Sequence, residues 1–217
     1  MSDFDWSIVW REVPFLAQGM ALSLLLVAVA TAGGLVLGVG LALMRLSSRL
    51  WLAAPAAGYV TIMRSLPLVL VLFWFYFLVP LLLGRPVGAL ASALVAFVLF
   101  EAAFYCEIIR AGIASVVVGQ TQAARATGLR PYQTFRLIVW PQALRAMVPL
   151  LINQVIIVFQ DTSLVYVVAL RDFMTSASVI ADRDGRPTEM YTVVAVVYLV
   201  ICYGASKIVE LSQRPAT

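Results

Sequence analysis

Five long apolar runs, separated by short segments that carry most of the charges, dominate the sequence. In the first, no charged residue lies between Glu12 and Arg45, and residues 20–44 are enough to cross a bilayer, which takes about 20 apolar residues in a helix. Four further runs are interpreted in the same way, at 65–84, 88–110, 147–170 and 190–206. The pattern predicts an all-α membrane protein with about five transmembrane helices, in which residues 1–217 form a single domain.

The composition agrees with a membrane setting. Apolar residues make up 63% of the 217 residues and charged residues 12%, whereas average soluble domains are about half apolar and about a quarter charged. Histidine is absent, which removes the commonest general base. The two cysteines, Cys106 and Cys202, lie in apolar runs and offer neither a disulfide framework nor metal-ligand spacing.

Glycines are concentrated in the second half of the first run. Gly34 and Gly38 form a Gly-x-x-x-Gly step, flanked by Gly33 and Gly40. Small residues at this spacing let the backbones of two membrane helices approach closely. We therefore expect a second helix to pack against this part of the first span, although membrane helices also tolerate glycine without such a contact.

Proline and glycine mark both ends of the second run. Pro67 lies near its start, and Pro80 with the sequence Gly84-Arg85-Pro86 ends it, because these residues interrupt a helix. Before it, Arg45 and Arg49 mark a polar edge, and residues 45–64, of mixed character, are expected to form a loop on the cytoplasmic side.

The distribution of basic residues predicts the orientation, because the cytoplasmic side of a membrane protein carries more arginine and lysine. Residues 1–10 include Asp3 and Asp5 but no basic residue, so they lack the n-region of a cleavable signal, and the first run is expected to remain as a span. The N-terminus is then outside and the C-terminus in the cytoplasm. The ten residues assigned to the cytoplasm are Arg45, Arg49, Arg64, Arg110, Arg125, Arg130, Arg136, Arg145, Lys207 and Arg214, against Arg11, Arg85, Arg171, Arg183 and Arg186 outside.

Several polar side chains interrupt the apolar runs. Glu101 and Glu107 lie in the third run, where a carboxylate at mid-bilayer costs about 2.5–3.5 kcal/mol on insertion scales. Being six residues apart, they fall on different faces of a helix and do not form a catalytic carboxylate pair. Glu107 can reach the membrane interface beside Arg110, whereas Glu101 sits deeper. The fourth run carries Asn153, Gln154, Gln160 and Asp161.

Two interpretations of these embedded groups remain open. Arg64, Glu101, Gln160 and Asp161 are candidates for a polar translocation path or for contacts that switch between inward and outward states. Alternatively, the same groups hold helices together through hydrogen bonds, each worth under about 2 kcal/mol. If the substrate is an acidic amino acid, Arg64 is the best single cation to meet it.

Residues 111–145 differ from the apolar runs on either side. They contain arginines spaced among glycines and prolines, and we predict two or three short amphipathic helices outside the bilayer. Pro131 suits a first helical turn. Tyr132, Phe135 and Val139 recur at helical spacing and form one apolar face.

A spaced motif occupies the middle of this segment. Gln122-Ala123-Ala124 is followed by Gly128, then by Ile138 and Trp140-Pro141. The motif resembles the signature loop of binding-protein-dependent ABC importer permeases: Glu-Ala-Ala, three residues, Gly, nine residues, Ile, one residue, Leu-Pro. The spacing is kept throughout, but Gln122 replaces the glutamate and Trp140 replaces the leucine. Gln122 therefore lacks the charge for a salt bridge to an ATPase.

Further residues resemble the polar amino acid permeases within that family. Residues 63–68 are similar to the entry of their second span, residues 100–113 to their third-span motif, and residues 159–164 to their fourth-span motif. Two short stretches, Asp182-Arg183-Asp184-Gly185 and Phe4-Asp5-Trp6, resemble the glutamate/aspartate importer permeases in particular.

The resemblance implies a type I ABC importer permease with a cytoplasmic coupling helix in the bacterial inner membrane. It implies an ABC ATPase dimer, a second permease that is identical or a sister subunit, a periplasmic solute-binding protein and an amino-acid substrate as partners, besides membrane lipid and without nucleic acid. The partner ATPase, and not this chain, would bind ATP and magnesium. The residues that would couple to it are Gly119, Gln122, Ala123, Ala124, Gly128, Ile138 and Pro141.

The residues themselves fit such a role. Ala123 and Ala124 permit close approach, and Gly128 allows a left-handed turn at a helix end. No Gly-x-x-x-x-Gly-Lys-Ser/Thr loop is present to hold nucleotide phosphates, and no Ser-His-Asp or Cys-His pair is possible. For the chain as a whole, the alternatives are a permease for glutamine, histidine, arginine or cystine, or a passive channel or secondary transporter. For residues 111–145, the alternative is a basic loop held near anionic lipid.

Overall fold

The computed structural model describes residues 4–213, and within that range the chain is helical, with no β-strand. This confirms the all-α fold class. Asp3 and Arg214, which entered the predictions of the N-terminus and of the orientation, lie outside the described residues. The long helices are α1 (Trp6–Arg45), α2 (Leu50–Ser65), α5 (Ala89–Ala114), α8 (Trp140–Asp161) and α10 (Pro187–Gln213).

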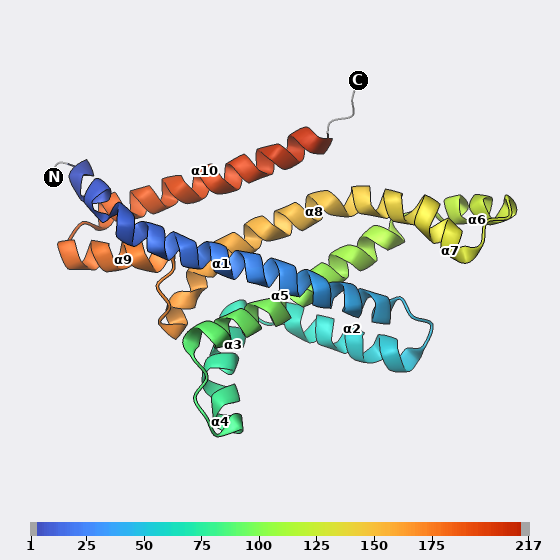
Figure 1. The fold of residues 1–217 in the computed structure, drawn as a ribbon, viewed down its shortest axis with the longest axis horizontal. Helices are drawn as coiled ribbons and strands as arrows, with labels where there is room; N and C mark the ends of the chain where they lie inside the picture. Colours follow the sequence, from blue (N-terminus) through green and yellow to red (C-terminus); the bar gives the residue numbers. More distant parts are fainter. Residues whose placement is uncertain (1–3, 214–217) are drawn as a thin grey trace.

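Shorter elements connect the long helices. Among them are two π-helical turns, η1 and η2, and one 3₁₀ segment, η3. The short elements are α3 (Leu68–Phe73), η1 (Trp74–Leu78), α4 (Val79–Leu83), α6 (Val118–Ala126), α7 (Pro131–Thr134), η2 (Phe135–Val139), η3 (Thr162–Val168) and α9 (Phe173–Asp184). In Figure 1, α9 and the start of α1 lie at one end of the bundle, and α6 and α7 project beyond the other end.

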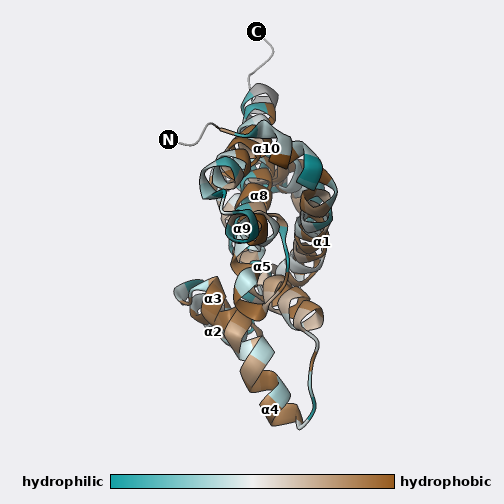
Figure 2. Cartoon of the chain, turned by 90° about the vertical axis from the view of Figure 1, so that its left-hand side faces the viewer, coloured by the Kyte–Doolittle hydropathy of each residue, from teal (hydrophilic) through white to brown (hydrophobic). Residues whose placement is uncertain are grey.

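Four helical stretches are long and apolar enough to cross a membrane, and a bent pair of helices brings the number to five. The continuous stretches are Trp6–Arg45, Ala89–Ala114, Pro131–Val168 and Pro187–Ile208. Figure 2 shows apolar residues along most of the bundle and a more polar surface around α9. The helix α1 is longer than the predicted span because Asp5 caps it, its side chain accepting a 2.9 Å hydrogen bond from the backbone N–H of Ser7.

The second span differs from the prediction. Residues 50–64, expected to belong to the loop 45–64, form with Ser65 the helix α2, which packs against α1 and α5 with Ala56 and Val60 buried. The chain then turns by 106° into residues 68–83, so 65–84 is not one straight helix. Pro67 explains the turn, because a residue before proline avoids the helical region, and Leu66 is extended at φ −104° and ψ 142°.

Proline also explains the two π-helical turns. Pro80 and Pro141 each lack the N–H that an α-helix needs, and each follows one of these turns. The backbone N–H of Trp140 bonds back to the carbonyl of Phe135, five residues earlier, and that of Val79 bonds in the same way to Trp74. The wider turn therefore lets the chain pass a proline without breaking the helix.

Glycines bring α1 and α5 together, as predicted from their spacing. A β-carbon on Gly38 would lie 2.7 Å from the Cβ of Tyr105 and 3.0 Å from the backbone nitrogen of Cys106. One on Gly34 would lie 2.9 Å from the Cβ of Glu101, whereas Gly40 faces open space. The Gly34–Gly38 step is therefore a close-packed seam that holds α5 against α1.

A second seam fixes α9 to the first half of α1. The hydroxyl of Ser23 accepts a 3.2 Å hydrogen bond from the backbone N–H of Phe173, and Gly19 leaves room for Asp172 and Ser176. Asp172 is fully buried and caps α9 by accepting from the backbone N–H groups of Met174 and Thr175 at 3.1 and 3.0 Å. This arrangement places α9 alongside the first half of α1.

Candidate functional site

The candidate coupling helix α6 ends in a well-formed Schellman motif. The backbone N–H of Leu129 bonds to the carbonyl of Ala124 at 3.2 Å, and that of Gly128 bonds to Arg125 at 3.0 Å. Gly128 has a φ of +87°, a conformation that side-chain-bearing residues rarely adopt. The sharp left-handed turn expected at this glycine is therefore confirmed.

After this turn the chain folds back on α6. The helix α6 packs against α7 and η2, burying Ala124, Thr134 and Val139. Residues 131–145 are not separate short helices as predicted, because α7, η2 and α8 run as one helix from Pro131 into the bundle. The π-turn that accommodates Pro141 makes this continuity possible, and it joins the coupling segment rigidly to the fourth span.

The residues of the spaced motif divide into an exposed set and a set that faces the chain itself. Gly119, Gln122, Ala123 and Gly128 are exposed on and beside α6, and Pro141 is exposed at the start of α8. Ala124 is buried and Ile138 half-buried, so their small or apolar side chains serve the internal packing of α6. The face of α6 that remains open to another protein is therefore the one that carries Gly119, Gln122 and Ala123.

Glu101 is fully buried within the bundle. The Nε2 group of Gln154 on α8 donates a 2.8 Å hydrogen bond to its Oε2, whereas Oε1 has no hydrogen-bond partner among residues 4–213. Asp161, two turns along α8 from Gln154, is half-buried. The structure thus joins Glu101 to Gln154 between α5 and α8, and Asp161 lies farther along α8.

Gln160 and Arg64 lie in other surroundings. The Nε2 group of Gln160 faces α10, 3.8 Å from the sulfur of Cys202. The guanidinium of Arg64 lies 4.0 Å from the carboxylate of Glu107 and 5.6 Å from the ring centre of Phe104. The four candidates for a translocation path therefore do not form a single cluster.

Glu107 joins three arginines from three helices. Its carboxylate pairs closely with Arg45 at the end of α1 and with Arg110 one turn along α5, and more loosely with Arg64 at the end of α2. Sequence spacing suggested Arg110 as a neighbour but gave no sign of Arg45, which is 62 residues away. The cluster ties the ends of α1 and α2 to α5 on the side of the bundle that leads to α6.

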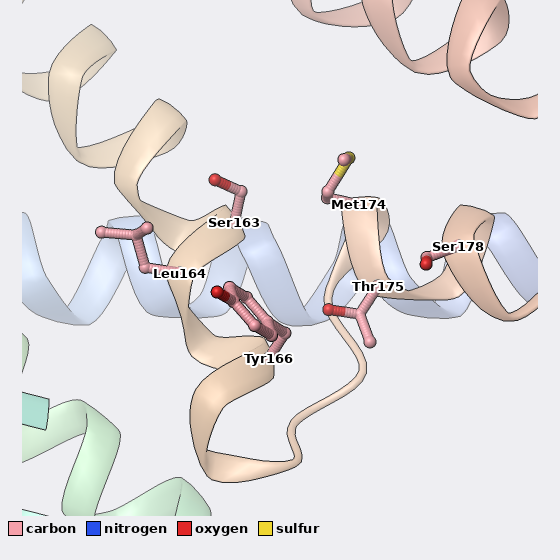
Figure 3. Close-up of a pocket in the computed structure, with 6 residues that line it drawn as sticks. All are labelled: Ser163, Leu164, Tyr166, Met174, Thr175 and Ser178. Atoms are coloured by element: carbon pink, nitrogen blue, oxygen red, sulfur yellow. The ribbon is translucent and has the colours of Figure 1, made fainter. Parts of the chain in front are cut away.

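A hydroxyl-rich cavity of about 440 Å³ lies between η3 and α9. Figure 3 shows Ser163, Leu164 and Tyr166 from η3 on one side and Met174, Thr175 and Ser178 from α9 on the other. Ala169 makes this arrangement possible, because its positive φ of 58° turns the chain back after η3. Of these residues, Ser163 and Leu164 lie in the stretch 159–164 that resembles a fourth-span motif, whereas Tyr166, Met174, Thr175 and Ser178 belong to no pattern that marks a cavity.

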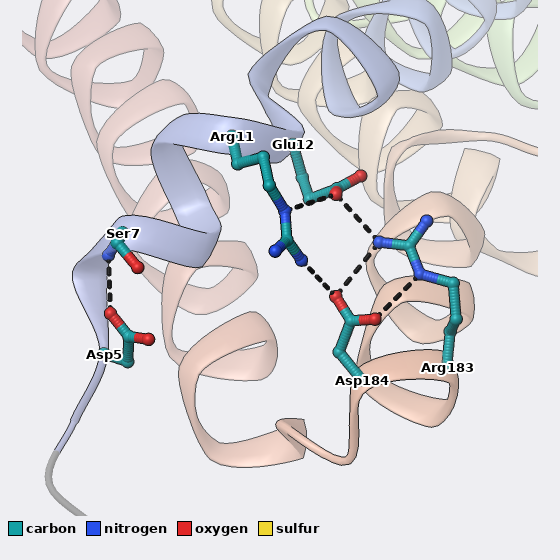
Figure 4. Close-up of polar contacts among 6 residues, drawn as sticks. All are labelled: Asp5, Ser7, Arg11, Glu12, Arg183 and Asp184. Atoms are coloured by element: carbon teal, nitrogen blue, oxygen red, sulfur yellow. Dashed lines mark hydrogen bonds and ion pairs between the residues drawn. The ribbon is translucent and has the colours of Figure 1, made fainter.

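The opposite end of α9 is tied to α1 by ion pairs, shown in Figure 4. Arg11 pairs with Asp184 at 2.7 Å, and Arg183 pairs with Glu12 at 2.8 Å and with Asp184 at 2.9 Å. The guanidinium of Arg183 lowers the pKa of the Asp184 carboxyl below its ordinary value of 3.8. Hydrogen bonds from Ser7 likewise lower the pKa of Asp5.

A bundle of helices long and apolar enough to cross a bilayer, with a projecting helix-turn element, defines an integral membrane protein. The chain belongs to the family of binding-protein-dependent transport system inner membrane components, which matches residues 34–214. It is 48% identical over 221 residues to the glutamate/aspartate import permease protein GltK of Escherichia coli O6:H1, with 99% of each chain covered. It is 32% identical to the glutamine transport system permease protein GlnP of Escherichia coli K12, with 97% of each covered.

Solved structures agree with this assignment. A chain from the crystal structure of an amino acid ABC transporter with histidines superposes with a TM-score of 0.90 at 29% identity, covering 97% of this chain and 98% of that one. The MetNI methionine ABC transporter in an inward-facing conformation shares the fold, with a TM-score of 0.72 at 20% identity, covering 99% of this chain and all of that one. The chain therefore has the fold of a type I ABC importer permease.

Proposed function

We propose that this chain is the permease subunit of an ATP-driven importer of glutamate and aspartate. The observation that carries the proposal is the full-length similarity to a glutamate/aspartate import permease, at 48% identity. The glutamine permease, at 32% identity, makes glutamine the second candidate substrate. Both assignments share one mechanism, in which this chain moves the substrate and does not hydrolyse ATP.

The coupling helix α6 would dock into a groove of a separate ATPase that binds ATP and magnesium. Its exposed residues Gly119, Gln122 and Ala123 present a small surface, and Gly128 fixes the angle between α6 and the following helix. Because α7, η2 and α8 are continuous, a movement of α6 is passed directly to the fourth span. In the orientation predicted from the basic residues, the loop 46–49 and residues 111–145 would be cytoplasmic, with the N-terminus outside and the C-terminus inside.

The substrate path would run along the face formed by η3, α9 and α10, which carries a few polar groups among mostly apolar side chains. Gln160, Ser163 and Tyr191 lie on this face, and polar groups that face lipid are costly. A second permease, identical or a sister subunit, would cover it, so that the path lies between two chains. Glu101 and Asp161 would border the path from within the bundle.

Arg64 lies outside this face, at the end of α2 beside Glu107, and is the cation that an acidic substrate would meet where it passes between α2 and α5. Its side chain is 44% exposed, and its 4.0 Å contact with Glu107 is loose enough to be exchanged for a substrate carboxylate. A periplasmic solute-binding protein would deliver the substrate at the end of the bundle where α9 lies.

Reconstituted vesicles test the proposal. The permease, its ATPase and its binding protein should together take up radiolabelled glutamate, with competition by aspartate and strict dependence on ATP. Gly128→Trp should abolish uptake while the protein still inserts, because the docking angle is lost. Gly84→Trp is the matched control, since Gly84 also has a positive φ of 64° but lies in the loop after α4.

Three outcomes would each overturn one part of this proposal: the docking of α6, the dependence on an ATPase, or the substrate. Normal uptake by Gly128→Trp would exclude the docking of α6. Uptake without any ATPase would establish a passive channel or secondary transporter instead. Competition by glutamine alone would replace the acidic substrate and leave the coupling mechanism in place.

A further inference from the structure

A basic surface cavity lies beside the candidate coupling helix. It has a volume of about 530 Å³ and is lined by Arg130, Tyr132, Gln133, Arg136 and Leu137, at the start of the helix that continues into the bundle. In Figure 1 this segment, α7, projects with α6 beyond the ends of α1, α2 and α5. The cavity is therefore at the part of the protein farthest from α9.

The arginines of this cavity have no carboxylate to neutralise them. The sequence contains no aspartate or glutamate between Glu107 and Asp161, although five arginines, at 110, 125, 130, 136 and 145, fall in that interval. Of these, Arg110 pairs with Glu107. Neither Arg130 nor Arg136 forms an ion pair within residues 4–213. At the other end of the bundle, by contrast, Arg11 and Arg183 are both paired with carboxylates of the chain.

The neighbouring coupling helix also lacks a negative charge. Gln122 stands where the family motif has a glutamate, so α6 offers no carboxylate to a partner. Because α6 packs against α7 and η2, its exposed face and the two arginines lie at the same end of the molecule. Electrostatic attraction at this surface must then come from arginines of this chain and acidic groups of the partner.

We propose that the Arg130–Arg136 cavity receives a carboxylate side chain of the partner ATPase, as a second docking contact beside α6. The inference rests on the proposed function, because it requires an ATPase at this surface. Two guanidinium groups with free N–H donors match a carboxylate in charge and geometry. A phospholipid phosphate has similar chemistry, but the cavity projects past the ends of the neighbouring spans, together with α6, and this position favours the ATPase.

Charge reversal in the complete complex tests the inference. The double variant Arg130→Glu/Arg136→Glu should bind its co-expressed ATPase about tenfold more weakly in detergent, and replacing acidic residues of the ATPase by arginine should restore binding. Arg49→Glu is the matched control, because Arg49 is an exposed arginine in the loop between α1 and α2 and does not line the cavity. An intermediate loss of ATPase binding in Arg130→Gln/Arg136→Gln would show that the weaker binding follows the charge and is not caused by misfolding.

Parallel measurements separate the possible failures. Unchanged ATPase affinity in the reversed variant, with weakened affinity in Gly128→Trp, would overturn the cavity inference and leave the proposed function standing. Unchanged ATPase affinity in both variants would show that the ATPase does not bind this surface, and would overturn both the cavity inference and the proposed function. Unchanged ATPase affinity with reduced binding to phosphatidylglycerol vesicles, but not to phosphatidylcholine vesicles, would assign the cavity to lipid and overturn the inference.

Discussion

The side-chain amide of Gln154 donates a 2.8 Å hydrogen bond to the buried carboxyl of Glu101, and this contact links α8 to α5 in the interior of the bundle. Both side chains are buried, Glu101 completely and Gln154 with 7% exposure. Each group therefore depends on the other, because burial removes the water that would otherwise satisfy it.

Removing the amide should destabilise the bundle. Gln154→Leu leaves the Glu101 carboxyl without a donor, and we expect a loss of about 1–3 kcal/mol in unfolding free energy. Glu101→Gln should be milder, because an amide still accepts the hydrogen bond. Unfolding in mixed detergent micelles measures both, with Asn153→Leu as the control, since Asn153 is exposed on the same helix. Equal stability of Gln154→Leu and Asn153→Leu would contradict this.

The glycine seam between α1 and α5 predicts a sharp contrast between neighbouring glycines. Gly38→Val would place a β-carbon 2.7 Å from Tyr105, so the two helices must separate, at a cost of about 1–3 kcal/mol. Gly40→Val meets open space and should be close to neutral. Thermal unfolding of the two purified variants provides the comparison. A similar loss of stability in both variants would mean that general helix propensity, and not the contact between α1 and α5, causes the loss.

Glu107 should control access to the region where it meets arginines of α1, α2 and α5. Glu107→Gln removes the charge that holds Arg45, Arg64 and Arg110, and the three guanidinium groups then repel one another. Cys106 is buried beside them and reports on opening. In a Cys202→Ser background, we expect maleimide to label Cys106 severalfold faster in Glu107→Gln than in the parent. The labelling rate of Glu107→Asp, which keeps the charge, should fall between the two. An unchanged rate in Glu107→Gln would show that packing alone shields Cys106.

The sequence predicted features that depend on local spacing. The Gly34–Gly38 step implied a close helix contact, and Gly128 implied a left-handed helix end, because each follows from the backbone of a few neighbouring residues. The all-α class and the number of spans followed from the lengths of the apolar runs. The helix α2 was not predicted, because Pro55 and Gly58 interrupt an otherwise uncharged stretch that tertiary packing stabilises as a helix.

Contacts between distant segments could not be predicted from the sequence. The pairing of Arg45 with Glu107 depends on how α1 and α5 lie together. The hydroxyl-rich cavity depends on the turn at Ala169, an alanine in a conformation usually taken by glycine. The continuity of α7 with α8 was hidden by Pro141, because proline normally ends a helix and the π-turn that absorbs it leaves no pattern in the sequence.

The ion pairs between α1 and α9 should make this end of the protein sensitive to acid. Arg183 lowers the pKa of Asp184 in the folded protein, so the carboxylate contributes stability fully above its ordinary pKa of 3.8 and loses it as the pH falls through the lower folded value. Wild-type protein should therefore be more stable than Asp184→Asn at neutral pH, and the difference should vanish in strong acid. Thermal unfolding across this range measures it, with Asp182→Asn as the control because Asp182 is exposed and outside the pairs of Figure 4. A constant difference at every pH would show that Asp184 acts through packing and not through its charge.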